Sequence, residues 1–391
     1  MKHHLLTLLI GLTIAAGGCM SGAEYQPPAE PVSIPARSFM KQWSYDLNLR
    51  GERVAALYAR EDVLTVQTTQ NNVYIIARDS GTLRFVKDVT TRNDRLFPPV
   101  LTDQWIIFPT HTALKLYDRR TGSEETINVD VSISTPAVYG DERLYFGTDH
   151  GNGGRIIAVD PESPLSPIVW RVMTEGAMSA APVFHTDVVY FGGQDDHVYA
   201  VSSSRGQVWA MEGSRFDARG KIEADLAIDD FALYVPVVNG VLYALDRSTG
   251  KVKWQFFGEG QLRTPPVAGQ QFVFQYVPGT GLVAIDKIRG EFTRSPRWVL
   301  RDGVQFLSED RDRVYVRTQD NQIVAVNKEN GEVVFRSQRN DFRVFATNTI
   351  DSTIYAATLD GNLYAITPVL QPGQVGELVL METELGPLAS R

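Results

Sequence analysis

Residues 242–254, LYALDRSTGKVKW, predict a β-hairpin. The first four residues are rich in strand formers. The carboxylate of Asp246 can accept hydrogen bonds from backbone N–H groups about two residues further on, and Gly250 can adopt a positive φ without a Cβ clash. The chain then returns as a second strand that ends on a large aromatic residue, Trp254. The stretch is therefore a complete strand–turn–strand unit.

The same unit recurs about eight times along the chain. Successive turn-entry positions lie 40 to 44 residues apart. They are Ala77, Asp118, Asp160, Ser202, Asp246, Asp286, Asn327 and Thr367. This period is the length of a four-stranded propeller blade, and the short β-rich runs lack the helical apolar spacing of an α-solenoid. The sequence therefore predicts an all-β fold, an eight-bladed β-propeller of four-stranded antiparallel blades.

Each unit also has an upstream half in which a strand often begins with proline. Proline cannot donate to a strand ladder, so it belongs on an edge strand or at the first position of a strand. We therefore expect these strands on the inner edges of the blades, next to the central axis. The prolines concerned are Pro99, Pro136, Pro182 and Pro266.

The two ends of the repeat array are expected to meet in one blade. The hairpin that ends at Thr367 has no return strand directly after it, whereas an unassigned strand around Trp43 precedes the first full unit. We expect the Trp43 strand to complete blade eight, which would leave no unpaired gap in the ring. The alternative is that residues 377–382, ELVLME, supply this strand after a longer loop.

The N-terminal residues are typical of a targeting segment. Lys2 precedes an apolar run over residues 5–16, which is too short to span a bilayer. Residues 16–19, AGGC, resemble a bacterial lipoprotein signal, so we expect removal of residues 1–18 and lipidation of Cys19. An ordinary secretory signal is the alternative. Met20 stands where an aspartate would mark retention at the inner membrane, which favours the outer membrane.

The remaining boundaries follow from these assignments. Residues 19–38 are proline-rich and are expected to be a semi-rigid tether. The propeller is expected over residues 39–368, and residues 369–391 form a C-terminal tail.

Composition limits the classes of partner. The chain of 391 residues has 38 Lys and Arg against 46 Asp and Glu, a net charge of −8. Nucleic-acid binding relies on basic side chains that neutralise phosphates, so we expect no nucleic-acid partner. Membrane contact should come from the lipid anchor rather than from attraction to anionic lipid. Because Cys19 is the single cysteine, no intrachain disulfide can form.

Few residues suggest chemistry. The recurring aspartates are interpreted as turn caps rather than as a carboxylate ring. Trp170, Trp209, Trp254 and Trp298 are interpreted as packing residues between blades, with a sugar or quinone platform as the alternative. His150 and His197 occur in short polar turns on different units, too few for a metal site. The glycines of residues 151–154 are not followed by the Lys-Ser/Thr of a phosphate loop. We expect no catalytic residue, metal or cofactor.

The unit from Ala244 to Trp254 resembles the pyrroloquinoline-quinone-type propeller repeat, over about residues 43–367. One branch of that superfamily contains quinoprotein dehydrogenases. Membership of this branch would imply a pair of adjacent cysteines, a calcium ion and an Asp base. The sequence has no cysteine pair and no segment that matches the ligand segments of this branch. The other branch is the outer-membrane assembly factor BamB family, eight-bladed propellers without a cofactor. Length, lipoprotein signal, tether and repeat number are similar to that branch.

The resemblance also implies a docking segment. The resemblance implies that BamB-family proteins dock on their barrel-forming partner through a loop that carries a Leu-x-Leu-Arg-Gly-Glu-type segment. Residues 47–52, LNLRGE, match this segment in letters. Here the motif follows the first strand rather than a middle blade, and the loop at residues 174–181 lacks it. On this resemblance Leu47, Leu49 and Arg50 are partner contacts.

The sequence thus predicts a non-enzymatic, lipid-anchored scaffold on the periplasmic face of the bacterial outer membrane. It would be a monomeric propeller within a complex of outer-membrane β-barrel assembly proteins, binding partners and clients through loops on one face and through strand edges. Two alternatives stay open: a propeller that binds a cell-wall or carbohydrate ligand, and a quinoprotein.

Overall fold

The hairpin at residues 242–254 forms strands β20 (Val241–Leu245) and β21 (Val252–Phe257). The Asp246 carboxylate accepts hydrogen bonds from the backbone N–H of Thr249 at 2.9 Å and from the hydroxyls of Ser248 and Thr249. Gly250 has a φ of 72°, and its N–H donates to the Asp246 carbonyl at 2.8 Å. One carboxylate and one glycine in the left-handed region therefore hold the turn.

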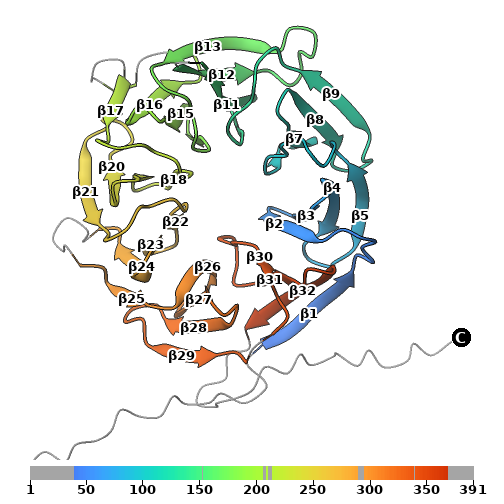
Figure 1. Ribbon diagram of the computed structural model, residues 1–391, viewed down its shortest axis with the longest axis vertical. Helices are drawn as coiled ribbons and strands as arrows, with labels where there is room; N and C mark the ends of the chain where they lie inside the picture. Colours follow the sequence, from blue (N-terminus) through green and yellow to red (C-terminus); the bar gives the residue numbers. More distant parts are fainter. Residues whose placement is uncertain are drawn as a thin grey trace, which may run out of the picture. The chain divides into compact units, whose positions relative to one another are not determined.

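Eight four-stranded antiparallel sheets are arranged as blades around a central axis in the computed structural model (Figure 1). The structure describes residues 39–151, 153–205, 208–209, 214–288, 295–338 and 340–368. All the elements in these ranges are β-strands, which confirms the predicted all-β, eight-bladed propeller. No helix in these ranges is long and apolar enough to cross a membrane.

Each blade runs from an inner strand near the axis to an outer strand at the rim. Blades 1 to 4 comprise, in that order, β2 (Val54–Arg60), β3 (Val63–Thr68), β4 (Asn72–Ala77), β5 (Leu83–Asp88); β6 (Val100–Leu101), β7 (Trp105–Pro109), β8 (Ala113–Asp118), β9 (Glu124–Asn128); β10 (Val138–Gly140), β11 (Arg143–His150), β12 (Gly153–Val159), β13 (Ile168–Thr174); β14 (Val183–His185), β15 (Val188–Gly192), β16 (His197–Ser202), β17 (Arg215–Asp217). Blades 5 to 8 comprise β18 (Ala227–Ile228), β19 (Leu233–Pro236), β20, β21; β22 (Val267–Ala268), β23 (Phe272–Val277), β24 (Gly281–Asp286), β25 (Trp298–Leu300); β26 (Gly303–Glu309), β27 (Arg313–Thr318), β28 (Ile323–Asn327), β29 (Val333–Arg336); β30 (Val344–Phe345), β31 (Ile354–Ala357), β32 (Asn362–Pro368), β1 (Phe39–Asp46).

The inner strands follow the prolines singled out in the sequence. Pro99, Pro182 and Pro266 directly precede β6, β14 and β22, and Pro136 lies two residues before the start of β10; each of these strands is an edge strand of its blade. Figure 1 shows the corresponding strands β2, β18, β22 and β30 nearest the axis. No further strand pairs with the inner edge of these strands, so the N–H that proline lacks is not needed there.

The N-terminal strand closes the ring, and β1 lies beside β32 in Figure 1. The two strands are antiparallel, with Phe39 opposite Pro368 and Asp46 opposite Asn362. Blade 8 therefore takes its outer strand from the start of the propeller and its other three strands from the end, as predicted. Residues 377–382, the alternative for this position, lie outside the described residues.

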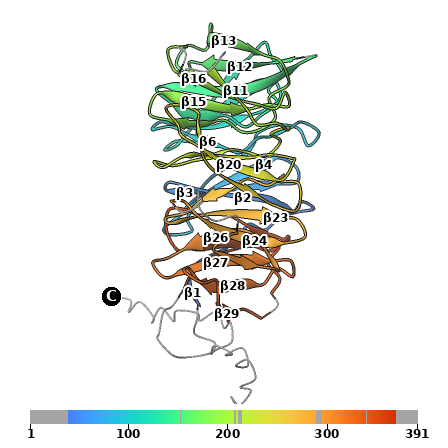
Figure 2. The ribbon, with the colours of Figure 1, turned by 90° about the vertical axis from the view of Figure 1, so that its left-hand side faces the viewer.

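The blade topology gives the propeller two faces. The turns between the first and second and between the third and fourth strands lie at one end of each blade, which we call the hairpin face. The turns between the second and third strands, and the links from each outer strand to the next blade, lie at the other end, which we call the connection face. In the side view of Figure 2 the strands run across the thickness of the ring between these faces.

Tryptophans in the outer strands, or shortly before one in the case of Trp209, join neighbouring blades. The indole N–H of Trp298 donates to the backbone carbonyl of Lys328 in the next blade at 2.8 Å. The same bond, at 2.7–2.9 Å, joins Trp43 to Arg78, Trp170 to Ser203, Trp209 to Arg247 and Trp254 to Lys287. All five tryptophans are buried. Each buried indole N–H thus has the partner that burial demands, and that partner belongs to the following blade.

A glycine in the following blade makes room for the tryptophan ring. A Cβ on Gly331 would lie 2.6 Å from the Trp298 ring, and a Cβ on Gly81 would lie 2.6 Å from the Trp43 ring. Both glycines end the hairpin turn with a positive φ, 72° and 70°. The turn glycine therefore serves the backbone conformation and the contact between blades at once.

Replacing Gly331 by alanine should destabilise the propeller more than replacing Gly279, although both have a positive φ. Nothing lies within 4 Å of a Cβ on Gly279, so Gly279→Ala should cost only the left-handed backbone term, about 1 to 2 kcal/mol. Gly331→Ala should cost about 1 to 3 kcal/mol more because the methyl group displaces Trp298. Urea unfolding followed by tryptophan fluorescence measures both. Equal losses would show that the ring does not need the space.

Candidate functional site

Residues 47–52, LNLRGE, link outer strand β1 of blade 8 to inner strand β2 of blade 1 on the connection face. The N–H of Leu47 donates to the Gly361 carbonyl at 3.1 Å, which ties the loop to a turn of blade 8. Leu47 itself is only 7% exposed and packs in the core between blades 8 and 1. Leu49 is half-buried and Arg50 is exposed. The loop therefore presents Leu49 and Arg50, while Leu47 fixes its position.

Leu49 forms part of the wall of a groove of about 890 Å³ on the connection face. Three segments line the groove: residues 49–53, the link at residues 340–343 between blades 7 and 8, and residues 358–364 of blade 8. Its apolar lining consists of Leu49, Phe342, Leu359 and Tyr364, and the centroids of the Phe342 and Tyr364 rings are 5.1 Å apart. The groove exists where the ring closes, because links on both sides of blade 8 meet there.

Two of the acids that line the groove accept hydrogen bonds from neighbouring side chains. The carboxylate of Glu52 accepts hydrogen bonds from Thr68 and Asn72. Asp360 accepts from Thr358 and Asn362, and the Thr358 hydrogen bond is the main cause that holds the Asp360 pKa below its ordinary value. These two acids are therefore engaged within the fold.

The two arginines that line the groove are exposed side chains. Arg53 and Arg343 are exposed, and neither forms an ion pair with another described residue. The Arg343 guanidinium donates to the Asn340 and Phe342 carbonyls. Asp341 is an exposed acid of the same lining. The groove thus has a mostly polar lining, in which two arginines and three acids surround four apolar residues.

A second, smaller hollow of about 440 Å³ lies between blades 2 and 3 on the same face. It contains Arg95, His111, Ser132 and Asp149, and the Ser132 hydroxyl is 2.7 Å from His111 Nε2. Nucleophilic catalysis requires a base that a third group orients. No hydrogen bond joins Asp149 to His111 in the described part of the chain, so this pair is a polar surface contact.

The other polar candidates from the sequence have local roles. Asp118, Asp160, Asp286 and Asn327 each accept backbone N–H bonds within their own turns. His150 and His197 lie at the ends of strands in different blades. Over the described ranges, no three His, Cys, Asp or Glu side chains are grouped so that they could hold a metal ion. Cys19, the expected lipidation site, lies outside the described residues.

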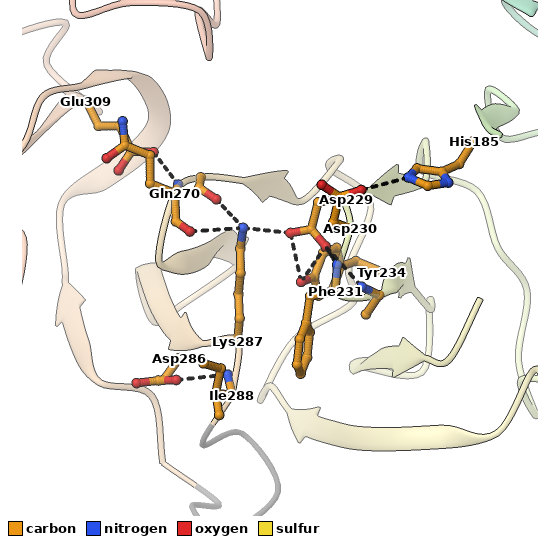
Figure 3. A network of polar contacts seen from close by, with 12 residues as sticks. His185, Asp229, Asp230, Phe231, Tyr234, Gln270, Asp286, Lys287, Ile288 and Glu309 are labelled. Carbon is orange, nitrogen blue, oxygen red and sulfur yellow. Dashed lines mark hydrogen bonds and ion pairs between the residues drawn. The ribbon is translucent and has the colours of Figure 1, made fainter. Parts of the chain in front are cut away.

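A buried polar network crosses blades 5, 6 and 7 on the hairpin face (Figure 3). Lys287 Nζ lies 2.6 Å from the Asp229 carboxylate and donates to the Gly269 and Gln270 carbonyls. The Gln270 backbone N–H donates to Glu309 at 2.6 Å. These contacts link three successive blades. Each of these polar groups would be costly to bury without its partner.

Lys328 extends this network within blade 7. Its Nζ lies 2.9 Å from Glu309 and 3.1 Å from the side-chain oxygen of Gln270. The side chains of Lys328 and Glu309 are 4% and 6% exposed. A charge so deeply buried is tolerated because the opposite charge and further hydrogen bonds accompany it. This arrangement is structural.

These contacts have a periodic signal in the sequence, in addition to the aspartates and tryptophans of the repeat. The residue after the turn-entry position is a cation in five units: Arg78, Arg119, Arg247, Lys287 and Lys328. Arg78 pairs with Asp351, Arg119 with Asp62 and Lys287 with Asp229, each acid lying in the first turn of the preceding blade. The recurring cation is therefore a second link between blades.

The chain is an eight-bladed β-propeller. Its candidate site is the groove that loops form where the ring closes. A family model described as outer membrane protein assembly factor BamB matches residues 111–255, 197–293 and 238–375. The chain belongs to this family. A comparison with curated protein sequences finds no match.

Solved structures agree with the fold. BamB from Moraxella catarrhalis is 18% identical, with a TM-score of 0.64 over 84% of this chain and 97% of that one. The designed protein Ika8 is 14% identical, with a TM-score of 0.62 over 83% and 98%. A quinohemoprotein alcohol dehydrogenase from Comamonas testosteroni is 14% identical, with a TM-score of 0.62 over 91% and 79%. At these identities the likeness shows the propeller fold alone.

Asp229→Asn should lower the free energy of unfolding at pH 7 by about 1.5 to 3 kcal/mol, because it removes the charged partner of Lys287. Burial acts to raise the Asp229 pKa, but Lys287 and two backbone N–H groups outweigh it and hold the pKa below its ordinary value. This stability is therefore present above the unfolded-state pKa and is lost as the pH falls through the folded-state pKa. Urea unfolding at pH 7 and at about pH 3 measures the difference.

The matched control is Asp230→Asn. Asp230 is fully exposed and contacts His185 and Arg247, so its replacement should leave the free energy of unfolding nearly unchanged. A gap between wild type and Asp229→Asn that stays constant over the same pH range would contradict the assigned ion pair.

Proposed function

We propose that this protein is a non-enzymatic scaffold of the outer-membrane β-barrel assembly machinery. The observation that carries the proposal is membership of the BamB family, described as an outer membrane protein assembly factor. The groove and loops at the ring closure support it, because they suit a protein partner. An eight-bladed ring offers a rigid support on which loops from several blades can hold such a partner.

The partner binds the loop at residues 47–52. Arg50 is exposed beside Leu49, and Leu49 lines the groove at the closing blade. An arginine next to an apolar pocket is the kind of residue that dominates protein interfaces. Leu47 contributes by anchoring the loop in the core between blades 8 and 1. The partner surface is therefore expected to combine an apolar side chain with a carboxylate.

The protein is held at the periplasmic face of the outer membrane through a lipid on Cys19. The lipoprotein-like residues 16–19 and the family support this location. Residues 19–38 would then separate the propeller from the bilayer.

Arg50→Ala should weaken co-purification of the barrel-forming partner about tenfold, a loss typical of an interface anchor. The measurement is mild-detergent purification of the tagged protein with quantitative mass spectrometry of what accompanies it. Arg92→Ala is the matched control, because Arg92 is also exposed and lies in the link between blades 1 and 2. An absence of any barrel-assembly protein from the wild-type sample would refute the proposed role, and equal recovery with Arg50→Ala would refute the proposed contact.

Cys19→Ser should move the protein from the membrane fraction to the soluble periplasmic fraction. A single acyl chain already gives measurable membrane binding, and two signals are needed for stable anchoring, so loss of the lipidated residue should release the protein. Fractionation and immunoblotting detect the change. A Cys19→Ser protein that stays with the membrane would show that something other than this lipid holds it there.

A further inference from the structure

The hollow of about 440 Å³ between blades 2 and 3 is formed by four segments that meet on the connection face. They are the link at residues 89–99, the turn at residues 110–112, the link at residues 129–137 and the end of β11. Each segment contributes a polar side chain to the lining: Arg95, His111, Ser132 and Asp149. A volume of this size falls in the range of small-molecule sites, about 300 to 1,000 Å³.

Local contacts hold Arg95 in this hollow. Its backbone N–H donates to the Asp94 carboxylate at 2.8 Å, and its guanidinium carbon lies 4.5 Å from the centre of the Phe97 ring. Phe97 is buried, and its N–H donates to the Pro109 carbonyl in blade 2 at 2.9 Å. The Arg95 side chain therefore packs against an anchored aromatic ring, although the residue as a whole stays exposed.

The other segments of the lining are fixed in a similar way. The Ile133 N–H donates to the His111 carbonyl at 2.8 Å, and the Ser132 hydroxyl is 2.7 Å from His111 Nε2. Asp149 pairs with Gly154 in the ladder between β11 and β12. Polar groups that are already in place lose little conformational entropy when a ligand binds. The hollow is therefore a pre-organised polar site.

The lining carries one exposed group of each charge without an ion pair. Arg95 and Asp149 form no ion pair with each other or with another residue of the described ranges. The charge of Arg95 also acts on Asp225, in the link before blade 5, but no ion pair joins these two residues, and the Asp225 carboxylate accepts a hydrogen bond from the Ala181 N–H at 2.7 Å. An anion alone would leave Asp149 unpaired, and a cation alone would leave Arg95 unpaired. A ligand that carries both charges can pair with both side chains.

We propose that this hollow binds a small zwitterion, a free amino acid or a short peptide, with the carboxylate at Arg95 and the ammonium group at Asp149. A guanidinium group suits a carboxylate because it can donate two parallel hydrogen bonds. The Ser132 hydroxyl can donate to or accept from a peptide group of the ligand. Nothing lies within 4 Å of a Cβ on Gly151, which also lines the hollow, so the hollow is open on this side. The site is independent of the proposed scaffold function, because it involves none of the residues that line the groove at the ring closure.

A series of peptides tests the proposal on the purified full-length protein. Glycine, diglycine and triglycine differ in the distance between their two charges, and ligand-observed NMR titration measures the affinity of each. We expect one member of the series to bind best. Removing its positive charge by N-acetylation, or its negative charge by C-terminal amidation, should weaken binding about tenfold each, because each change removes a charge-assisted hydrogen bond. These comparisons leave the protein unchanged, so they do not depend on the folding of a variant.

Two variants assign the two charges to their partners. Arg95→Gln should weaken binding of the best peptide about tenfold and remove the effect of amidation, while the effect of N-acetylation remains. Asp149→Asn should weaken binding by a similar factor and remove the effect of N-acetylation alone. The matched controls are Arg92→Gln and Asp130→Asn, because Arg92 and Asp130 are exposed residues of the same two links and do not line the hollow. Both controls should leave every affinity unchanged.

The proposal falls if no peptide of the series binds, or if the N-acetylated or the amidated form binds as tightly as the free peptide. Glucose that binds as tightly as the best peptide would also contradict it, because the hollow would then recognise hydroxyl groups rather than charges. Equal weakening by the two control variants and the two lining variants would overturn it as well. None of these results affects the scaffold proposal, which is tested by co-purification of the partner.

Discussion

At five interfaces between described blades, the indole N–H of a tryptophan in or near the outer strand donates to a backbone carbonyl of the next blade, and at Trp43 and Trp298 a glycine makes room for the ring. This contact makes the blades on either side of these interfaces depend on each other. A four-stranded sheet of this length buries little on its own, so the core consists of the interfaces between blades. Blade 1 needs the tryptophan of a preceding blade, and Trp43 supplies it because β1 is part of blade 8. Closure is therefore a condition of stability.

The closure also creates the candidate site. Because β1 runs to the connection face and continues into blade 1, residues 47–52 must pass over blade 8. Gly361 allows this passage, since a Cβ there would lie 2.9 Å from Leu49. The link at residues 340–343 approaches from blade 7, and together with residues 358–364 these segments form the groove. The same covalent arrangement that completes the ring thus assembles a surface on which apolar, basic and acidic side chains from three segments meet.

Much of the fold follows from local patterns in the sequence. The Asp246–Gly250 turn and the spacing of about 40 residues predict blade number and strand order, because hairpins depend on neighbouring residues. Trp43 predicts the closing strand, since the last unit lacks its aromatic. The groove could not be predicted, because residues 49, 342 and 359 come from three separate segments whose paths depend on packing. The burial of Leu47 was hidden for the same reason. The network of Lys287 and Lys328 had a periodic signal, but its partners belong to other elements far along the chain.

Hydrogen–deuterium exchange on the full-length protein, alone and with its barrel-forming partner, tests the central claim that the closing blade is the docking site. The account predicts that added protection by the partner is concentrated in residues 47–53, 340–343 and 358–362, while the links of blades 3 to 5 exchange as before. These links are a fair comparison because they lie on the same face. Protection centred on residues 174–181, with the closing blade unchanged, would contradict the account and place the partner on a middle blade.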